Sequence, residues 1–309
     1  MSDLKRDLVI PTWAELPNEA RSKWSARIDE LPPVSPLLGS FGSFGLNLRD
    51  FDARELAEKV GHDAVLGARL LAVANSARFG LSQPLTSIQR AMVHMGFNLV
   101  KTIIIGYLME TGFSGDKTIP NAHREFIHGW TAGASVIAFR WGQRVELSDP
   151  STAGTVALLC RVGSLMLGSV DPHIGTEYQK MESETARLRY EIETWGITSP
   201  VLSAELIRKW ELPSAVAEMC AQAANPVIKL CPPDPLDPYP RILTVVAASL
   251  VIADLYMRGA AIDEMLAELK DNPDYQYLTI NLESHRLLHL LTEAWHKPNV
   301  QRELASVTK

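Results

Sequence analysis

The sequence predicts an all-α protein, and three observations support this fold class. Apolar residues recur at the three- and four-residue spacing of an amphipathic helix in almost every segment. Polar capping residues, glycines and prolines separate these segments. No stretch of useful length alternates apolar and polar residues as a half-buried strand does, and no short-period repeat is found.

The first helices can be placed from their end signals. Asp52 and Glu55 have the spacing of a capping box, and Gly61 supplies a left-handed stop, so a helix is expected over residues 52–61. Residues 62–80 then carry an apolar stripe at helical spacing. The next helices are expected over residues 86–96 and 98–110.

A small, polar stretch over residues 111–120 is the best candidate for a boundary within the chain. Beyond it, Asp149 or Ser151 caps a helix that has Pro150 in its first turn. A proline-dense stretch, residues 231–240, excludes regular structure. The helices expected in this half span residues 123–145, 149–170, 175–196, 199–213, 214–226, 241–259, 261–270 and 282–297.

Composition indicates a soluble cytoplasmic protein. The 309 residues carry 30 Lys and Arg against 36 Asp and Glu, and this mild acidity gives no bulk attraction for nucleic acid or anionic membranes. Three cysteines do not make a disulfide framework and fit a reducing compartment. The longest apolar run, about a dozen residues, is too short for a bilayer. We therefore expect neither DNA nor a membrane as a partner.

Motifs for common chemistries are weak or absent. The chain has no P-loop, no CxxC pair and no nucleophile elbow, and the glycine-rich residues 39–45 are interpreted as a turn. His285 and His289 have a chelating spacing but no third ligand nearby, so packing or surface roles are favoured. A helix-turn-helix interpretation of residues 63–96 is disfavoured, because the second helix carries little basic character.

One apolar segment, ALLCRVGSLML at residues 157–167, holds an arginine near its centre. The neighbours of Arg161 one turn away are small or apolar. Its head group therefore either snorkels to water or is buried and paired with an anion, and periodicity alone leaves both alternatives open.

Several motifs resemble those of the HDOD domain family, a divergent branch of the HD phosphohydrolase superfamily found in bacterial signalling proteins. LPPVSPLLGSF at residues 31–41 is similar to the family's start, and the block over residues 56–105, with the Asn75–Ser76 pair, is similar to its most specific part. WGITSPVLSAELIRKWELP, residues 195–213, also matches. The resemblance implies a 1–30 extension whose Trp13 and Trp24 are available to dock, a 31–114 helical bundle, and a degenerate HD-type bundle over 115–309.

The resemblance also implies where the superfamily's metal ligands would stand. A His, a His–Asp pair and a distant Asp bind the metal in the parent superfamily, and the metal then generates hydroxide. Here FIHGW offers His128, LLCRVG puts Cys160 and Arg161 in place of the pair, and VIADLY offers Asp254. Ser199, Ala223 and Ala224 stand where relatives often carry further histidines.

These departures predict a vestigial pocket formed by His128, Cys160, Arg161, Ser199 and Asp254, with no catalytic residue, metal or cofactor. An arginine in place of the aspartate reverses the charge beside any divalent ion, at a cost of several kcal/mol. We hypothesise that Arg161 replaces the metal and pairs with Asp254. The alternative is that it meets an anionic ligand such as a nucleotide phosphate.

The resemblance and the lost ligands together favour a non-catalytic signal-transduction adaptor that acts through contacts with signalling proteins. A sensor of a nucleotide or another anion is one alternative, and a residual metal-dependent phosphohydrolase is the other.

Overall fold

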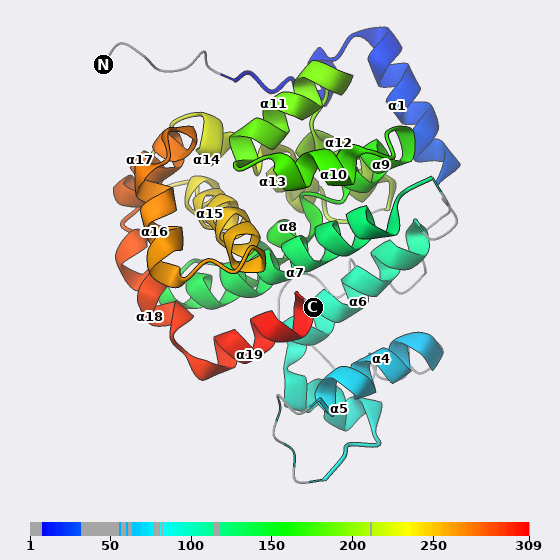
Figure 1. The fold of residues 1–309 in the computed structure, drawn as a ribbon, viewed down its shortest axis with the longest axis vertical. Coiled ribbons are helices and arrows are strands. Elements are labelled where there is room, and N and C mark those ends of the chain that lie inside the picture. The colour runs from blue at the N-terminus through cyan, green and yellow to red at the C-terminus, as the bar shows by residue number, and fades with distance from the viewer. Residues whose placement is uncertain are drawn as a thin grey trace.

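The computed structural model describes residues 8–31, 56, 60, 64–76, 79, 81, 83–113, 118–210 and 212–308, and these residues form helices and loops without a strand (Figure 1). The predicted all-α class is confirmed. The predicted helix at 52–61 and the glycine-rich residues 39–45 lie mostly or wholly outside the described residues.

Three largely buried helices form the centre of the molecule. α7 (Asn121–Arg144) crosses the middle of Figure 1 and packs along both α8 (Pro150–Leu159) and α15 (Tyr239–Met257). As the sequence predicts, Asp149 caps α8, because its carboxylate accepts the Thr152 N–H over 2.9 Å. Nearly all of α8 and most of α15 are buried, so apolar residues surround these two helices on most sides.

Further helices cover this centre. One group follows α8 in the chain and comprises α9 (Gly163–Val170), α10 (Ile174–Lys180), α11 (Glu184–Trp195), α12 (Ser199–Lys209), α13 (Ser214–Gln222) and α14 (Asn225–Ile228). The C-terminal group comprises α16 (Ile262–Asp271), η4 (Pro273–Tyr275), α17 (Gln276–Ser284), η5 (Leu288–Leu290), α18 (Leu291–Trp295) and α19 (Pro298–Val307). α19 returns to lie along α7 (Figure 1).

The N-terminal part contributes η1 (Trp13–Glu15), α1 (Asn18–Glu30), α4 (Ala64–Ala74), α5 (Ile88–Met95) and α6 (Phe97–Gly112). Trp24 of α1 is buried, and the Lys209 ammonium of α12 donates to the Ile28 carbonyl. The leading segment therefore docks onto the body through Trp24, as its sequence predicts. Trp13 packs against the core but stays partly exposed.

The Asn75 motif has a clear structural role. The Asn75 amide donates to the Leu85 carbonyl over 2.8 Å and accepts the Leu85 N–H over 2.6 Å. This paired contact fastens the connection between α4 and α5 onto the end of α4. A side-chain amide offers a donor and an acceptor at the spacing of a backbone peptide, which explains why an asparagine serves here.

Several helices that the sequence predicts as continuous are interrupted in the structure. The helix expected over residues 149–170 ends at Leu159 and restarts at Gly163. The Gly163 N–H donates to the Ser203 hydroxyl over 2.8 Å instead of continuing the ladder. The helix expected over residues 175–196 also divides, and the Ser183 side chain caps its second part by accepting the Ala186 N–H.

Two described stretches are long and apolar enough by composition to cross a bilayer, namely residues 150–170 and 239–257. The first is divided between α8 and α9, and both are mostly buried within the fold. Core helices pass the same test of length and hydropathy, so these stretches are weak evidence for a membrane location. The expectation that no apolar run has the length to span a bilayer was nevertheless wrong.

Candidate functional site

Arg161 lies in the interruption between α8 and α9, and its side chain is only 1% exposed. The snorkelling alternative is therefore wrong, and the guanidinium is a buried cation. Its Nη1 donates to the Ser199 hydroxyl over 2.8 Å. Its ion pairs are with Glu184 and, over 3.7 Å, with Glu191.

The hypothesised pair between Arg161 and Asp254 is not what the structure shows. Asp254, on α15, pairs instead with Arg187 of α11 over 2.8 Å and with Arg258 over 3.2 Å. Arg187 also lies 3.9 Å from Glu184, which joins the two sets of charges. The sequence argument that a buried aspartate requires a cation holds, but the cation is Arg187 of α11 and not Arg161.

These contacts form one buried ion network, which we define as Arg161, Glu184, Arg187, Glu191, Asp254 and Arg258. Its three cations and three anions balance. Arg258 lies at the rim and is 34% exposed, whereas the other five side chains are almost fully buried.

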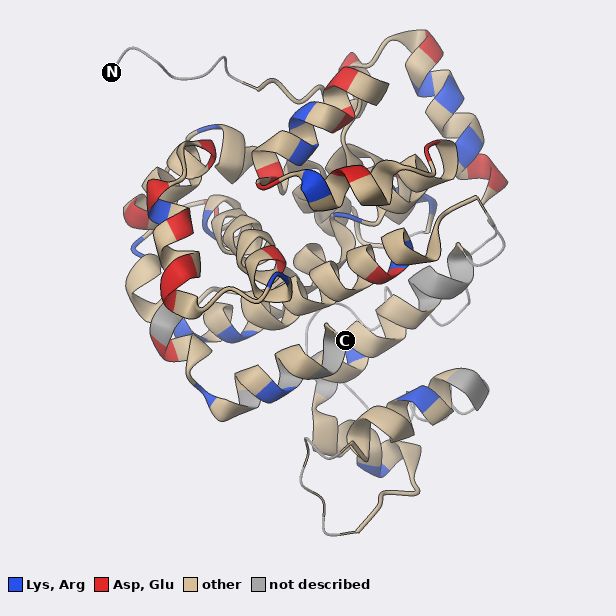
Figure 2. Ribbon diagram, viewed as in Figure 1, with Lys and Arg blue, Asp and Glu red and all other residues tan. Residues whose placement is uncertain are grey.

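Helix α11 supplies half of the network because of its spacing. Glu184, Arg187 and Glu191 are three and then four residues apart, so they share one face of the helix. Figure 2 shows α11 banded with both charge signs. The network face is turned inward, and the polar residues Glu193 and Thr194 are exposed.

Polar and aromatic side chains complete the environment of the network. The Ser199 hydroxyl and N–H both donate to Glu191, over 2.7 and 2.6 Å, and the Tyr178 hydroxyl donates to the same carboxylate. Burial, together with the Glu191 charge, raises the pKa of Tyr178, so this hydroxyl keeps its proton. The Trp130 ring lies 5.5 Å from the Arg161 guanidinium and 5.0 Å from that of Arg187.

Cys160 is fully buried beside Arg161, and its thiol is a poor ligand. Burial raises the pKa of Cys160 to about 12, although the adjacent Arg161 charge acts in the opposite direction. A metal needs the thiolate. The thiol instead donates weakly to the Ala157 carbonyl.

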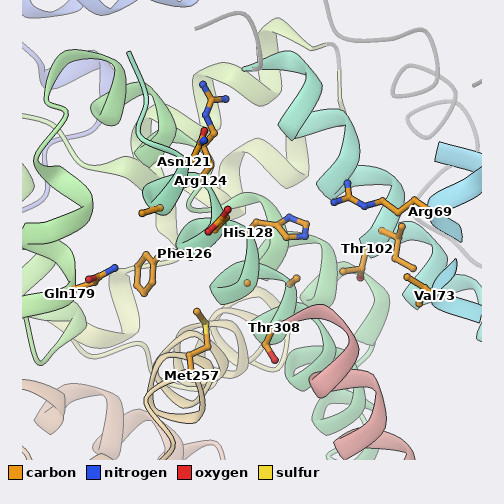
Figure 3. Close-up of a pocket in the computed structure, with 15 residues that line it drawn as sticks. Arg69, Val73, Thr102, Asn121, Arg124, Phe126, His128, Gln179, Met257 and Thr308 are labelled. Atoms are coloured by element: carbon orange, nitrogen blue, oxygen red, sulfur yellow. The ribbon is translucent and has the colours of Figure 1, made fainter. Parts of the chain in front are cut away.

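His128 lines a cleft of about 750 Å³ between α4, α6 and α7 (Figure 3). Arg69 and Thr102 line the same side of the cleft, and Met257 and Thr308 close its other end. The His128 ring also packs against Gly106, where an added Cβ would stand 2.4 Å from the ring.

The structure therefore divides the predicted vestigial pocket. It joins Ser199 directly to Arg161, keeps Cys160 beside them, and links Asp254 through Arg187 and Glu184. None of these four lines the cleft to which His128 belongs.

These residues do not fit a divalent metal. The Cys160 thiol is protonated, and Asp254 is already engaged by two guanidinium groups. Arg161 adds a fixed positive charge where a cation would have to bind. In the described part of the chain, no three His, Cys, Asp or Glu side chains are grouped as a metal site.

The two C-terminal histidines are not arranged for chelation. Arg286 adopts a left-handed backbone with φ 55°, so the predicted continuous helix over 282–297 is interrupted between His285 and His289. His285 donates to the Cys231 carbonyl over 2.7 Å. It therefore has a packing role, which is the interpretation that the sequence favoured.

Sequence reasoning missed most of the network, namely Glu184, Arg187, Glu191 and Arg258. It also missed the neighbouring Tyr178 and Trp130. One usable signal was present. A helical wheel of residues 184–191 places Glu184, Arg187 and Glu191 on a single face, and the apolar Leu188 lies beside them. Their contact with Arg161 depends on tertiary packing and has no local signal.

Comparisons with known proteins agree with this architecture. The chain is similar in structure to an HDOD domain protein of unknown function from Geobacter sulfurreducens, with 19% identity and a TM-score of 0.63, over 90% of this chain and 97% of that one. A candidate phosphohydrolase from Shewanella amazonensis matches with 20% identity and a TM-score of 0.63, over 92% and 97% of the two chains.

A candidate signal transduction protein from Marinobacter aquaeolei matches with 17% identity and a TM-score of 0.58, over 90% of this chain and 66% of that one. At these identities the likeness shows the fold alone. No curated protein matches the chain. The family model of the HDOD domain matches residues 45–226, more than half of the sequence, and the chain therefore belongs to the HDOD domain family.

Proposed function

We propose that this protein is a non-catalytic regulator in bacterial signal transduction, located in the cytoplasm and acting through contacts with other signalling proteins. The observation that carries the proposal is the buried ion network, in which Arg161 stands where the parent superfamily keeps a metal-binding aspartate. A site of this composition offers a substrate neither a metal nor an activated water.

The energetics of the network support a structural role. Buried charges are costly to desolvate, and they persist where each is paired and hydrogen-bonded. Here every anion of the network contacts at least one guanidinium, and Glu191 also accepts from Ser199 and Tyr178. Such a network holds α8, α11 and α15 in one arrangement, and a rigid body of this kind suits a protein that presents surfaces to partners.

A hydrolysis assay separates this proposal from a residual phosphohydrolase. The purified full chain is incubated with bis(p-nitrophenyl) phosphate and added Mn²⁺, and its metal content is measured by elemental analysis. We expect no turnover above that of the His128→Ala variant. Activity that is lost in His128→Ala but kept in His173→Ala, a change at an exposed histidine, would overturn the proposal.

A sensor of an anionic ligand is the second candidate, and the cleft is the observation that favours it. Its volume of about 750 Å³ suits a nucleotide-sized molecule. Arg161 is enclosed by carboxylates and cannot meet such a ligand, whereas Arg69, Arg124 and His128 line the cleft. The site for an anion would therefore be the cleft rather than the vestigial metal position.

Thermal unfolding tests this second candidate. A ligand that binds only the folded protein raises its melting temperature, and the rise grows with the logarithm of ligand concentration once the site is mostly filled. AMP, GMP and cyclic dinucleotides are the probes, and Arg69→Ala is the variant. A melting temperature unchanged by all of these nucleotides removes the sensor candidate, and a shift that Arg69→Ala abolishes supports it.

A further inference from the structure

His123 is the third residue of α7, and its side chain is fully buried at the junction of α7 with α9 and α10. Ser164 and Gly168 of α9 and Gly175 and Tyr178 of α10 pack around it. A Cβ added at Gly168 would stand 2.8 Å from the imidazole ring, and one added at Gly175 would stand 3.0 Å from the His123 Cβ. The two glycines therefore leave a slot that the histidine fills.

The contacts of the ring fix its tautomer. Nε2 lies 3.0 Å from the Ser164 carbonyl, which can only accept, so Nε2 carries the proton. The Ser164 hydroxyl also lies 3.2 Å from Nε2. The other ring nitrogen, Nδ1, is buried and has no hydrogen-bond partner among the described residues. The neutral ring is thus accommodated with one unmet acceptor.

A second proton on this ring would have nowhere to donate. Protonation adds an N–H at Nδ1 and a full positive charge, and both would be buried without a partner. The ring also belongs to the first turn of α7, where the helix dipole opposes a cation. The closed junction therefore selects the neutral histidine, and the charged form requires contact with water.

The groups around the ring do not reverse this preference. Burial has the largest effect and lowers the pKa of His123 from its ordinary value of 6.5. The charge of Arg124 acts in the same direction, whereas the Ser164 carbonyl and Asp171, at the end of α9, act against it. The Tyr178 hydroxyl keeps its proton and adds no charge.

The junction adjoins the cleft. Asn121 and Arg124, from the same turn of α7 as His123, line the cleft, and Gln179 of α10 lines it as well (Figure 3). A change in how α7 meets α10 therefore changes the wall of the cleft. We propose that this junction is a pH-sensitive switch, in which protonation of His123 separates the start of α7 from α9 and α10 and reshapes the cleft.

Hydrogen–deuterium exchange of the full chain tests the proposal. Exchange over α9 and α10 is compared at about pH 7.5 and about pH 5.5, after correction for the intrinsic pH dependence of the chemistry. An open junction binds its proton near pH 6.5 and a closed one only at lower pH, so exchange should accelerate by up to about tenfold. The amides of α15 are the internal reference and should stay protected.

Two histidine variants make the test specific. The side-chain amide of His123→Gln can still donate to the Ser164 carbonyl but does not titrate, so this variant should lose the acceleration. His173→Gln is the matched control, because His173 is an exposed histidine directly before α10. It should keep the acceleration.

The wild-type chain decides the outcome should His123→Gln fail to fold. Its His123 ring, followed by NMR, should titrate over the same pH interval in which α9 and α10 lose protection. Exchange that does not change with pH overturns the proposal, as does an acceleration that persists in His123→Gln or an equal loss of protection in α15. These outcomes leave the proposed non-catalytic function untouched, because that function rests on the buried ion network.

Discussion

The Arg187 guanidinium donates to the Asp254 carboxylate over 2.8 Å, and this contact joins α11 to α15 inside the core. Asp254 is the residue that the sequence resemblance predicts at the last metal-ligand position of the parent superfamily. Arg161 and Glu184 form a second buried pair, and both guanidinium groups lie near the Trp130 ring. Paired buried side chains therefore connect the helices of this interior.

Removal of Arg161 should destabilise the fold strongly. Arg161→Ala leaves Glu184 and Glu191 without their nearest cation, and an uncompensated buried charge typically costs about 3–5 kcal/mol. Urea unfolding followed by circular dichroism measures the difference. Arg144→Ala is the matched control, because its pair with Glu293 is about half exposed and should contribute about 1 kcal/mol or less. Equal losses in the two variants would contradict the structural role of the network.

The sequence was sufficient for the fold class and most helix positions, because periodicity and caps are local properties. It also showed that an aspartate at 254 needs a buried cation. It named Arg161 as that cation and was wrong, because the cation is Arg187. Both arginines approach the same Trp130 ring, and only the packed helices decide which carboxylate each one meets. The break before Gly163 was missed for the same reason, because its hydrogen-bond partner, Ser203, lies 40 residues away.

Lys101 should make stability rise in alkaline solution. Its ammonium is buried against Ser151 and Thr155, and burial lowers the pKa of Lys101 from 10.5 to about 8. Because the folded-state pKa is the lower one, the unfolded chain binds the extra proton between these values. Stability therefore increases as pH rises from about 8 to 10.5.

Lys101→Met tests this linkage. Below about pH 8 the charged lysine destabilises the fold by about 3 kcal/mol, at 1.36 kcal/mol per pKa unit. The variant should therefore be more stable than wild type at pH 7 by about 1–3 kcal/mol, after the lost hydrogen bonds are counted. Its free energy of unfolding should also lack the alkaline rise. Lys180→Met changes an exposed lysine and should leave the rise in place.

The three thiols should differ in their reaction with 5,5′-dithiobis(2-nitrobenzoic acid). Cys160 and Cys220 are fully buried with raised pKa values, whereas Cys231 is only partly buried at the start of the proline-dense stretch. The native protein should release about one equivalent of the chromophore quickly, and Cys231→Ser should remove that fast phase. Rapid reaction of Cys160 in the native state would show that the ion network opens readily.

Asn75→Ala should loosen the connection between α4 and α5. The change removes both hydrogen bonds to Leu85, and it should lower the free energy of unfolding by about 1–3 kcal/mol.

Asn75→Asp provides the sharper comparison. It keeps an acceptor for the Leu85 N–H but loses the donor to the Leu85 carbonyl, and it places a negative charge beside that oxygen. If the paired contact matters, Asn75→Asp is destabilised as well, and native-state hydrogen exchange shows faster exchange of the Leu85 amide in Asn75→Ala. An Asn75→Asp variant as stable as wild type would mean that the backbone N–H contact alone holds this connection.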